Sequence, residues 1–273
     1  MTRRKFIKST ALAALGGYLG VEYGLMEAKW LRITKAAFPV PNLPDAFKGK
    51  TVAFISDFHH GPHVPLDYIR HVVDMAIELK ADLVLLGGDY PHRGLKYVEP
   101  CINELSRLRA PLGVYAILGN HDHYDGVQPY VSEALRVAGI PELTNRGVWV
   151  RQNEDRFWLC GVGDYWQDIQ DLPAALAGAT TRDAVILLSH NPDYVEEIHD
   201  GRVGLVLSGH THGGQVNIPI VGAPVVPSIY GQKYVHGLVQ GPATQVFITR
   251  GIGTILPPIR IGCRPEIVHG TLV

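Results

Sequence analysis

The stretch that decides the fold reads Gly113-Val114-Tyr115-Ala116-Ile117-Leu118-Gly119-Asn120-His121-Asp122. Its apolar first part predicts a buried, central strand that stops at Gly119. Asn120 then offers a neutral amide oxygen, an oxygen ligand for a divalent metal ion. His121 offers an imidazole, and Asp122 can hold that imidazole in one orientation, as a third group does in acid/base catalysis. A polar turn would also contain these residues, so the rest of the chain decides between a turn and a site.

Four further apolar runs end in the same way, each just before a residue that can bind a metal ion. The runs are Thr51–Ser56, Asp82–Leu86, Ala184–Ser189 and Gly204–Ser208, and they lead to Asp57/His59, Asp89, His190 and His210/His212. Apolar residues at helical spacing predict a helix that begins at Pro65, a second that carries Val98 to Leu108, and a third over about 129–138. Strands that alternate with helices are largely parallel. Because the carboxyl ends of such strands share one edge, we expect the five endings to meet in one crevice.

The remaining strands are predicted from shorter patterns. Residues 30–40 are expected to form one or two edge strands, and residues 147–151 and 157–162 have β-rich patterning. The closing strand is predicted over Thr244–Thr249, just before Arg250.

The side chains at the five strand ends define the chemistry of the crevice. They are carboxylates, an amide and imidazoles, with no thiolate: Asp57, His59, Asp89, Asn120, His190, His210 and His212. Such a set suits Mn, Fe or Zn better than Mg or Ca. Seven ligands are too many for one four-coordinate ion with an open position. They suit two ions about 3.5–4 Å apart that share a carboxylate, activate a water and clamp a phosphoryl group.

These motifs resemble the full motif set of the calcineurin-like metallophosphoesterases. The motifs are Asp57-x-His59, Gly88-Asp89, Gly119-Asn120-His121-Asp122, His190 and Gly209-His210-Thr211-His212. Gly213-Gly214-Gln215, Arg250-Gly251-Ile252-Gly253 and the N-terminus resemble the YkuE/YaeI-type branch of twin-arginine-exported bacterial phosphoesterases. The resemblance implies an α/β fold, a β-sandwich of two mixed sheets flanked by helices (αββα), with the active site at the C-terminal ends of the strands.

The resemblance also implies a role for each residue. Asp57, His59, Asp89 and His212 would hold the first metal ion, and Asp89, Asn120, His190 and His210 the second, with Asp89 bridging. His121 would face the substrate, steady the phosphoryl charge and help the leaving oxygen depart, with Asp122 orienting it. The implied reaction is hydrolysis of a phosphodiester or phosphomonoester by a metal-bridging hydroxide. Arg250 is expected to clamp a phosphate or to form a structural salt bridge.

Three other functions remain open at this point. One is hydrolysis of the pyrophosphate bond of UDP-2,3-diacylglucosamine in lipid A synthesis, which some relatives catalyse; an export signal argues against it, because nucleotide sugars are cytoplasmic. The second is metal-dependent amide hydrolysis, which would not explain Asn120 or the His121-Asp122 pair. The third is an envelope-binding protein with a structural metal site, against which the complete ligand set and the additional His121 argue.

The N-terminus resembles an export signal. Arg3-Arg4 is followed by Phe6 and by a mild, Gly-rich apolar segment that Glu22 interrupts, which is typical of a twin-arginine signal. We therefore expect residues 1–28 to be a signal or an N-terminal anchor, and residues 29–273 to be the catalytic domain. The expected partners are a phosphoester, lipid or envelope component included, and the twin-arginine export machinery. The expected location is the periplasm or cell envelope, with membrane association through the N-terminus as an alternative.

Composition excludes other classes of function. The chain has 273 residues, is 46% hydrophobic and 19% charged, and is therefore globular rather than disordered. Its formal net charge is -1 and it has no basic stripe, which argues against nucleic-acid binding. Its three scattered cysteines, Cys101, Cys160 and Cys263, form neither a disulfide framework nor a CxxC motif.

Overall fold

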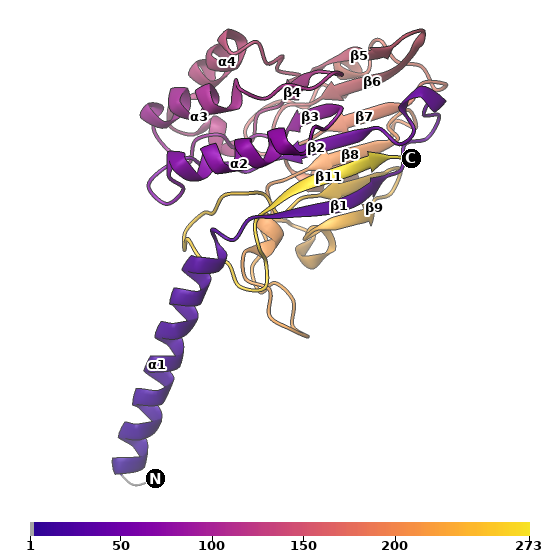
Figure 1. The fold of residues 1–273 in the computed structure, drawn as a ribbon. Coiled ribbons are helices and arrows are strands. Elements are labelled where there is room, and N and C mark those ends of the chain that lie inside the picture. Colours follow the sequence, from indigo (N-terminus) through magenta and orange to yellow (C-terminus); the bar gives the residue numbers. More distant parts are fainter. Residues whose placement is uncertain (1–2) are drawn as a thin grey trace.

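The computed structural model describes residues 3–273, which form two mixed sheets with helices on their outer faces (Figure 1). The first sheet has the order β1 (Arg32–Phe38), β11 (Glu266–Leu272), β2 (Thr51–Ile55), β3 (Leu83–Leu86) and β4 (Val114–Ala116). The second has the order β5 (Arg146–Gln152), β6 (Asp155–Gly161), β7 (Val185–Leu188), β8 (Leu205–Ser208), β10 (Gln245–Ile248) and β9 (Gly237–Gln240). The predicted sandwich of two mixed sheets flanked by helices is confirmed.

The helices are short apart from the first. They are α1 (Arg3–Glu27), α2 (Leu66–Glu78), α3 (Val98–Leu105), α4 (Gln128–Val137) and α5 (Leu172–Ala175). Single 3₁₀ turns join the elements: η1 (Asp45–Phe47), η2 (Leu95–Tyr97), η3 (Asn120–Asp122), η4 (Tyr124–Gly126), η5 (Pro192–Glu196), η6 (His212–Gly214) and η7 (Gly231–Tyr234). Among residues 3–273, no helix is both long enough and apolar enough to cross a membrane.

The core lies in three layers because the central strands bury both faces. In β2, Val52 and Phe54 point into the layer between the sheets, whereas Ala53 and Ile55 pack against the helical layer of α2, α3 and α4. The alternation follows from the two-residue period of a strand. The third layer covers the outer face of the second sheet and includes Val185 from β7.

The strands that carry the predicted ligands come from both sheets. β2, β3 and β4 are parallel to one another in the first sheet, and β7 and β8 are parallel neighbours in the second. The expectation of one shared edge is correct, but the edge belongs to a sandwich rather than to a single parallel sheet.

Two strand predictions need correction. β4 is neither central nor fully buried: it has three residues, lies at the edge of its sheet, and leaves Val114 and Tyr115 half-buried. The closing strand of the chain is β11 and not the predicted Thr244–Thr249, which forms β10. β11 escapes a search for apolar runs because Glu266 begins it and Gly270 interrupts it.

The base of α1 lies at the edge of the molecule that carries the predicted ligands. β1, which follows α1, is parallel to β11, and β11 is antiparallel to β2. The start of β1 therefore lies at the same edge of the sheet as the carboxyl end of β2, with β11 between them. Glu27 at the end of α1 is only 1% exposed, and its carboxylate accepts hydrogen bonds from the backbone N–H groups of Gly262 (3.1 Å) and Cys263 (2.7 Å).

Candidate metal centre

Most of the predicted ligands have an unusual backbone conformation. Five of them have positive φ angles: Asp57 (60°), His59 (47°), Asp89 (59°), His210 (70°) and His212 (52°). Residues other than glycine rarely adopt this left-handed conformation, and where they do, they cluster at functional sites because the strain must be compensated by the surrounding structure. The chain thus bends sharply at each strand end to present these side chains.

Two motif glycines allow the strand ends to approach one another. A Cβ atom on Gly209 would lie 2.1 Å from Ser56 Oγ and 2.5 Å from Asp57 Oδ2. A Cβ atom on Gly119 would lie 2.4 Å from Asp89 Oδ1 and 2.7 Å from the His190 ring. Only glycine fits at these positions, so the glycines of the motifs serve the packing of the site.

The structure brings a first group of ligand atoms together from β2, β3 and β8. His59 Nε2 lies 3.0 Å from His212 Nε2 and 3.4 Å from Asp89 Oδ2. His212 Nε2 lies 3.6 Å from Asp57 Oδ1. The nearest ligand atoms of Asp57, His59 and His212 all lie within 4.8 Å of one another, close enough to hold one ion. All these side chains are buried.

A second group lies beside the first and shares a carboxylate with it. His190 Nε2 is 3.2 Å from Asp89 Oδ2, the same oxygen that faces His59. His210 Nδ1 is 2.9 Å from the side-chain oxygen of Asn120. The remaining nitrogen of the His190 ring bonds to the Gly87 carbonyl at 2.7 Å, which fixes the orientation of that ring.

The electrostatics of the site fit bound cations. Burial raises the pKa of Asp57 to about 6 and lowers the pKa of His210 to about 3. Burial also lowers the pKa of His59 and of His212 well below the usual range, so both rings are neutral although their Nε2 atoms face each other. Asp57 Oδ2 is buried and has no hydrogen-bond partner within residues 3–273. A buried carboxylate oxygen and facing neutral imidazoles are suited to metal ligation.

The carboxylate of Asp89 is ionised although it is buried. Burial disfavours its ionised form, but His190, His121 and His59 together outweigh burial and hold the pKa of Asp89 well below its usual range. Burial lowers the pKa of His190, but Asp89, with Asp57 and Asp164, outweighs that burial and raises the pKa of the ring well above its usual value. A metal ion would replace the proton of His190, since metal ligation needs a neutral imidazole.

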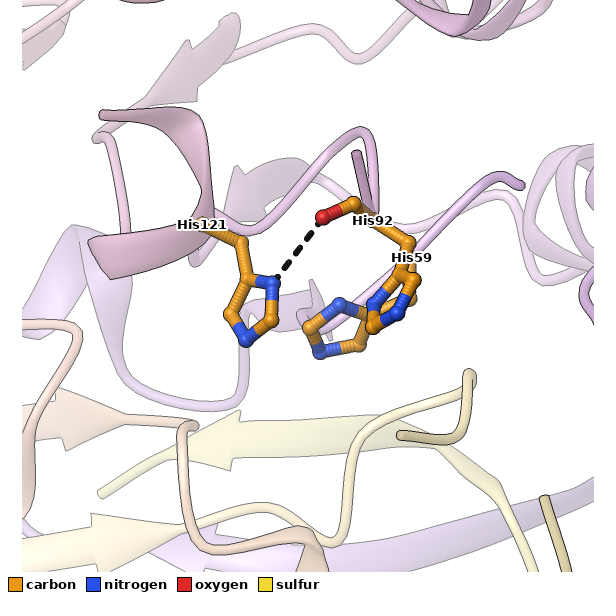
Figure 2. Close-up of side chains that lie close together, drawn as sticks. All are labelled: His59, His92 and His121. Carbon is orange, nitrogen blue, oxygen red and sulfur yellow. Dashed lines mark hydrogen bonds between the residues drawn. The ribbon is translucent and has the colours of Figure 1, made fainter. Parts of the chain in front are cut away.

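His121 lies at the side of the first group. Its ring is 4.6 Å from that of His59 and stacks on His92 at 5.2 Å, measured between centroids. Figure 2 shows that its Nδ1 points to the main-chain carbonyl of His92, 3.1 Å away. A carbonyl only accepts, so Nδ1 carries the proton and Nε2 on the opposite edge of the ring is left free of this bond.

The predicted role of Asp122 is wrong. Its carboxylate accepts three hydrogen bonds from the backbone N–H groups of Asp89 (2.7 Å), Tyr90 (2.8 Å) and Gly119 (2.8 Å). Neighbouring residues of a helical turn do not face each other, and His121 and Asp122 share the 3₁₀ turn η3. Asp122 therefore ties the β3 and β4 loops together, and the His92 carbonyl orients His121.

Arg250 forms the structural salt bridge. It pairs with the buried carboxylate of Glu266 at 2.9 Å and contacts His236 at 3.0 Å. Of the other histidines near the motifs, His60 bonds to the Val64 carbonyl at 2.9 Å, and the His92 ring meets the ring of the predicted ligand His59 edge-on at 5.7 Å.

Sequence reasoning missed three residues that contact the ligands. Arg260 is fully buried and donates to the main-chain carbonyls of His212 (3.3 Å) and Gly253 (2.6 Å). The Trp166 ring meets the His210 ring edge-on at 4.3 Å. The Tyr124 hydroxyl accepts from the Asn120 amide at 3.1 Å. No motif marks these residues: Tyr124 lies in η4, just after the Asn120 motif, whereas Trp166 and Arg260 lie outside the helices and strands.

Comparison with known proteins agrees with this geometry. The family model described as calcineurin-like phosphoesterase matches residues 50–214. Phosphodiesterase YaeI of Escherichia coli is 34% identical over 280 residues, which cover 100% of both chains. The metallophosphoesterase YkuE of Bacillus subtilis is 31% identical, over 100% of this chain and 98% of that one. A transmembrane protein with a metallophosphoesterase domain from Danio rerio is 31% identical over 96% of this chain and 62% of its own.

Proposed function

As a member of the calcineurin-like phosphoesterases, this chain is a metal-dependent hydrolase of phosphoester bonds, and we propose that it hydrolyses phosphodiesters at a dinuclear metal site. The observation that carries the dinuclear assignment is the position of Asp89 Oδ2, which faces His59 at 3.4 Å and His190 at 3.2 Å. One carboxylate oxygen thus borders both groups of ligands. The name of the Escherichia coli relative supports a phosphodiester as substrate.

In this proposal each ligand is assigned to one of the two ions. Asp57, His59 and His212 hold one ion and Asn120, His190 and His210 the other, with Asp89 between them. Two bound ions would clamp a phosphoryl group and lower the pKa of water to near neutral. When its ring carries a proton on both nitrogens, His121 would donate from Nε2 to the phosphoryl group or the leaving oxygen, while the His92 carbonyl holds the Nδ1 proton.

Hydrolysis of chromogenic esters tests this function. The purified protein with added Mn²⁺ should hydrolyse bis-p-nitrophenyl phosphate, and should hydrolyse p-nitrophenyl phosphate more slowly. A chelator should stop both reactions, and restored Mn²⁺ should recover them. A protein that binds metal but cleaves neither ester would be a binding protein, and cleavage of p-nitroanilides alone would point to amide hydrolysis.

We also propose export to the cell envelope through the twin-arginine pathway. The support is the Arg3-Arg4 pair before the apolar part of α1. The bonds of Glu27 to Gly262 and Cys263 argue against cleavage after Ala28. That cleavage would remove the acceptor of two backbone N–H groups, and at the buried Cys263 an unsatisfied N–H group costs about 1–3 kcal/mol. The helix is therefore proposed to stay attached to the domain.

Replacement of both arginines tests the export signal. Arg3→Lys with Arg4→Lys keeps the charge of the N-terminus, yet we expect the variant to remain in the cytoplasm with its specific activity intact. The measurement is immunoblotting of cell fractions together with the ester assay. Lys8→Arg is the matched control and should be exported normally. Normal export of the double variant would exclude the twin-arginine assignment.

A further inference from the structure

An apolar groove of about 250 Å³ opens beside the candidate metal centre. His212, one of the proposed ligands, is part of its lining together with Thr211. The other walls are almost entirely hydrocarbon and include Val225 and Leu256. His212 borders both the groove and the proposed metal centre, so the groove is within reach of the group next to a phosphoester bound at that centre.

The rim of the groove exposes large apolar side chains to solvent. Leu256 and Val225 are 64% and 76% exposed, and Ile220 and Ile229 on the same loop region are 107% and 73% exposed. Soluble monomeric proteins rarely gather such side chains without a partner. The apolar lining of the groove and the exposed apolar rim together indicate an apolar partner, one part of which enters the groove.

The rim and α1 extend from the same end of the molecule (Figure 1). The loop is held to the segment at 259–261, since Asn217 N–H donates to the Ile261 carbonyl at 2.7 Å. That segment in turn is held to α1, because Arg260 N–H donates to the Gly24 carbonyl at 3.0 Å. A Cβ on Gly24 would lie 2.9 Å from Ile259, so helix and segment are in close contact. The groove is thus fixed relative to α1.

The exposed surface of α1 matches a membrane surface. Apolar side chains along it, such as Leu15, Tyr18 and Leu19, are more than half exposed, and its first turns carry exposed Arg3 and Arg4. Basic residues at one end of an apolar helix favour contact with anionic lipid headgroups. A lipid bilayer would cover both the helix and the apolar rim.

We propose that the substrate is a membrane lipid phosphoester, with its phosphoester at the metal centre and its hydrocarbon part in the groove, and that the rim loop over residues 216–230 contacts the bilayer. This inference rests on the proposed phosphoesterase function and names its substrate class. Hydrolysis would break one P–O bond, with water supplying the hydroxyl for the phosphorus and the proton for the leaving alcohol.

A chain-length series tests the groove. The probes are methyl and hexyl p-nitrophenyl phosphate, kept below the concentration at which the hexyl ester aggregates. Because each buried methylene contributes roughly fourfold, the five additional methylenes of the hexyl ester should raise kcat/KM over that of the methyl ester on the order of 10³-fold. Leu256→Ser and Val225→Ser should each lower this ratio about tenfold. Val137→Ser, on α4 and 70% exposed, is the control and should keep the ratio.

The outcomes of the chain-length series separate the groove inference from the proposed phosphoesterase function. A ratio near one in the unaltered protein overturns the inference but leaves the phosphoesterase function intact. Failure to hydrolyse even the methyl ester would count against the proposed function itself. If one groove variant fails to fold, the other variant and the ratio of the unaltered protein still decide.

Vesicles test the contact with the bilayer. Hexadecyl p-nitrophenyl phosphate is embedded in vesicles of phosphatidylcholine and phosphatidylglycerol, and its hydrolysis is compared with that of the dissolved hexyl ester. Ile220 is fully exposed and does not line the groove. Ile220→Ser should lower the ratio of vesicle rate to solution rate severalfold, whereas Val137→Ser should keep it. An unchanged ratio in Ile220→Ser would contradict the membrane contact.

Discussion

Asp89→Asn is expected to lower the metal content from two ions per chain to one or none and to reduce hydrolysis on the order of 10²-fold or more. Asp89 Oδ2 borders both groups of ligands, with His59 on one side and His190 on the other. The amide removes the negative charge that would offset two cations and leaves only one oxygen to ligate. The measurements are elemental analysis and turnover of bis-p-nitrophenyl phosphate on the same sample.

Asp82→Asn is the matched control for this variant. Asp82 lies just before β3, as Asp89 lies just after it, and its carboxylate bonds to Thr51 and Lys50. This variant loses a carboxylate at the far end of the same strand, and should keep both ions and near-normal turnover. If Asp89→Asn keeps two ions and turns over normally, the bridging assignment is wrong.

His121→Ala should keep both metal ions and lose on the order of 10²–10⁴ in turnover, the usual contribution of a positioned acid or base. The structure gives His121 a carbonyl partner at 3.1 Å and places its ring at the side of the ligand groups. The loss should be smaller for esters of p-nitrophenol, which need little protonation on departure, and larger for alkyl esters. The measurement is turnover on both ester types beside elemental analysis.

His71→Ala is the control for loss of a histidine, because His71 is exposed on α2. Equal losses on both ester types would show that His121 stabilises charge without donating a proton. Loss of a metal ion from His121→Ala would instead show that His121 is a ligand. The nearest ring nitrogens of His59, His92 and His121 lie within 4.8 Å of one another, close enough for that alternative.

The strand ends could be predicted from the sequence because a buried strand is a continuous apolar run, and the first polar residue after the run marks its end. An apolar run such as Thr51–Ser56 has a clear limit, and a polar residue directly after it lies at the carboxyl edge of the sheet. The structure brings all the predicted ligands to that edge. The assignment of each ligand to one ion or the other stays a prediction.

The remaining features depend on contacts that local sequence does not reveal. The carboxylate of Glu266 at the start of β11 can be buried because Arg32 of β1 and Arg250, which follows β10, pair with it. Gly270 is needed there because a Cβ would lie 2.1 Å from the Phe38 ring. Asp122 directly follows His121 in the sequence, but its partners are main-chain N–H groups of three other residues. The groove is formed by irregular segments rich in proline, whose path no periodic pattern predicts.

Elemental analysis of the full-length protein tests the dinuclear centre most directly. The protein is saturated with Mn²⁺, Zn²⁺ or Fe²⁺ in turn, freed of loosely bound metal by gel filtration, and analysed for metal per chain. The ligands on the two sides of Asp89 predict two ions per chain, with the loss of either ion abolishing hydrolysis. A fully active protein that holds a single ion, or none, would contradict the account.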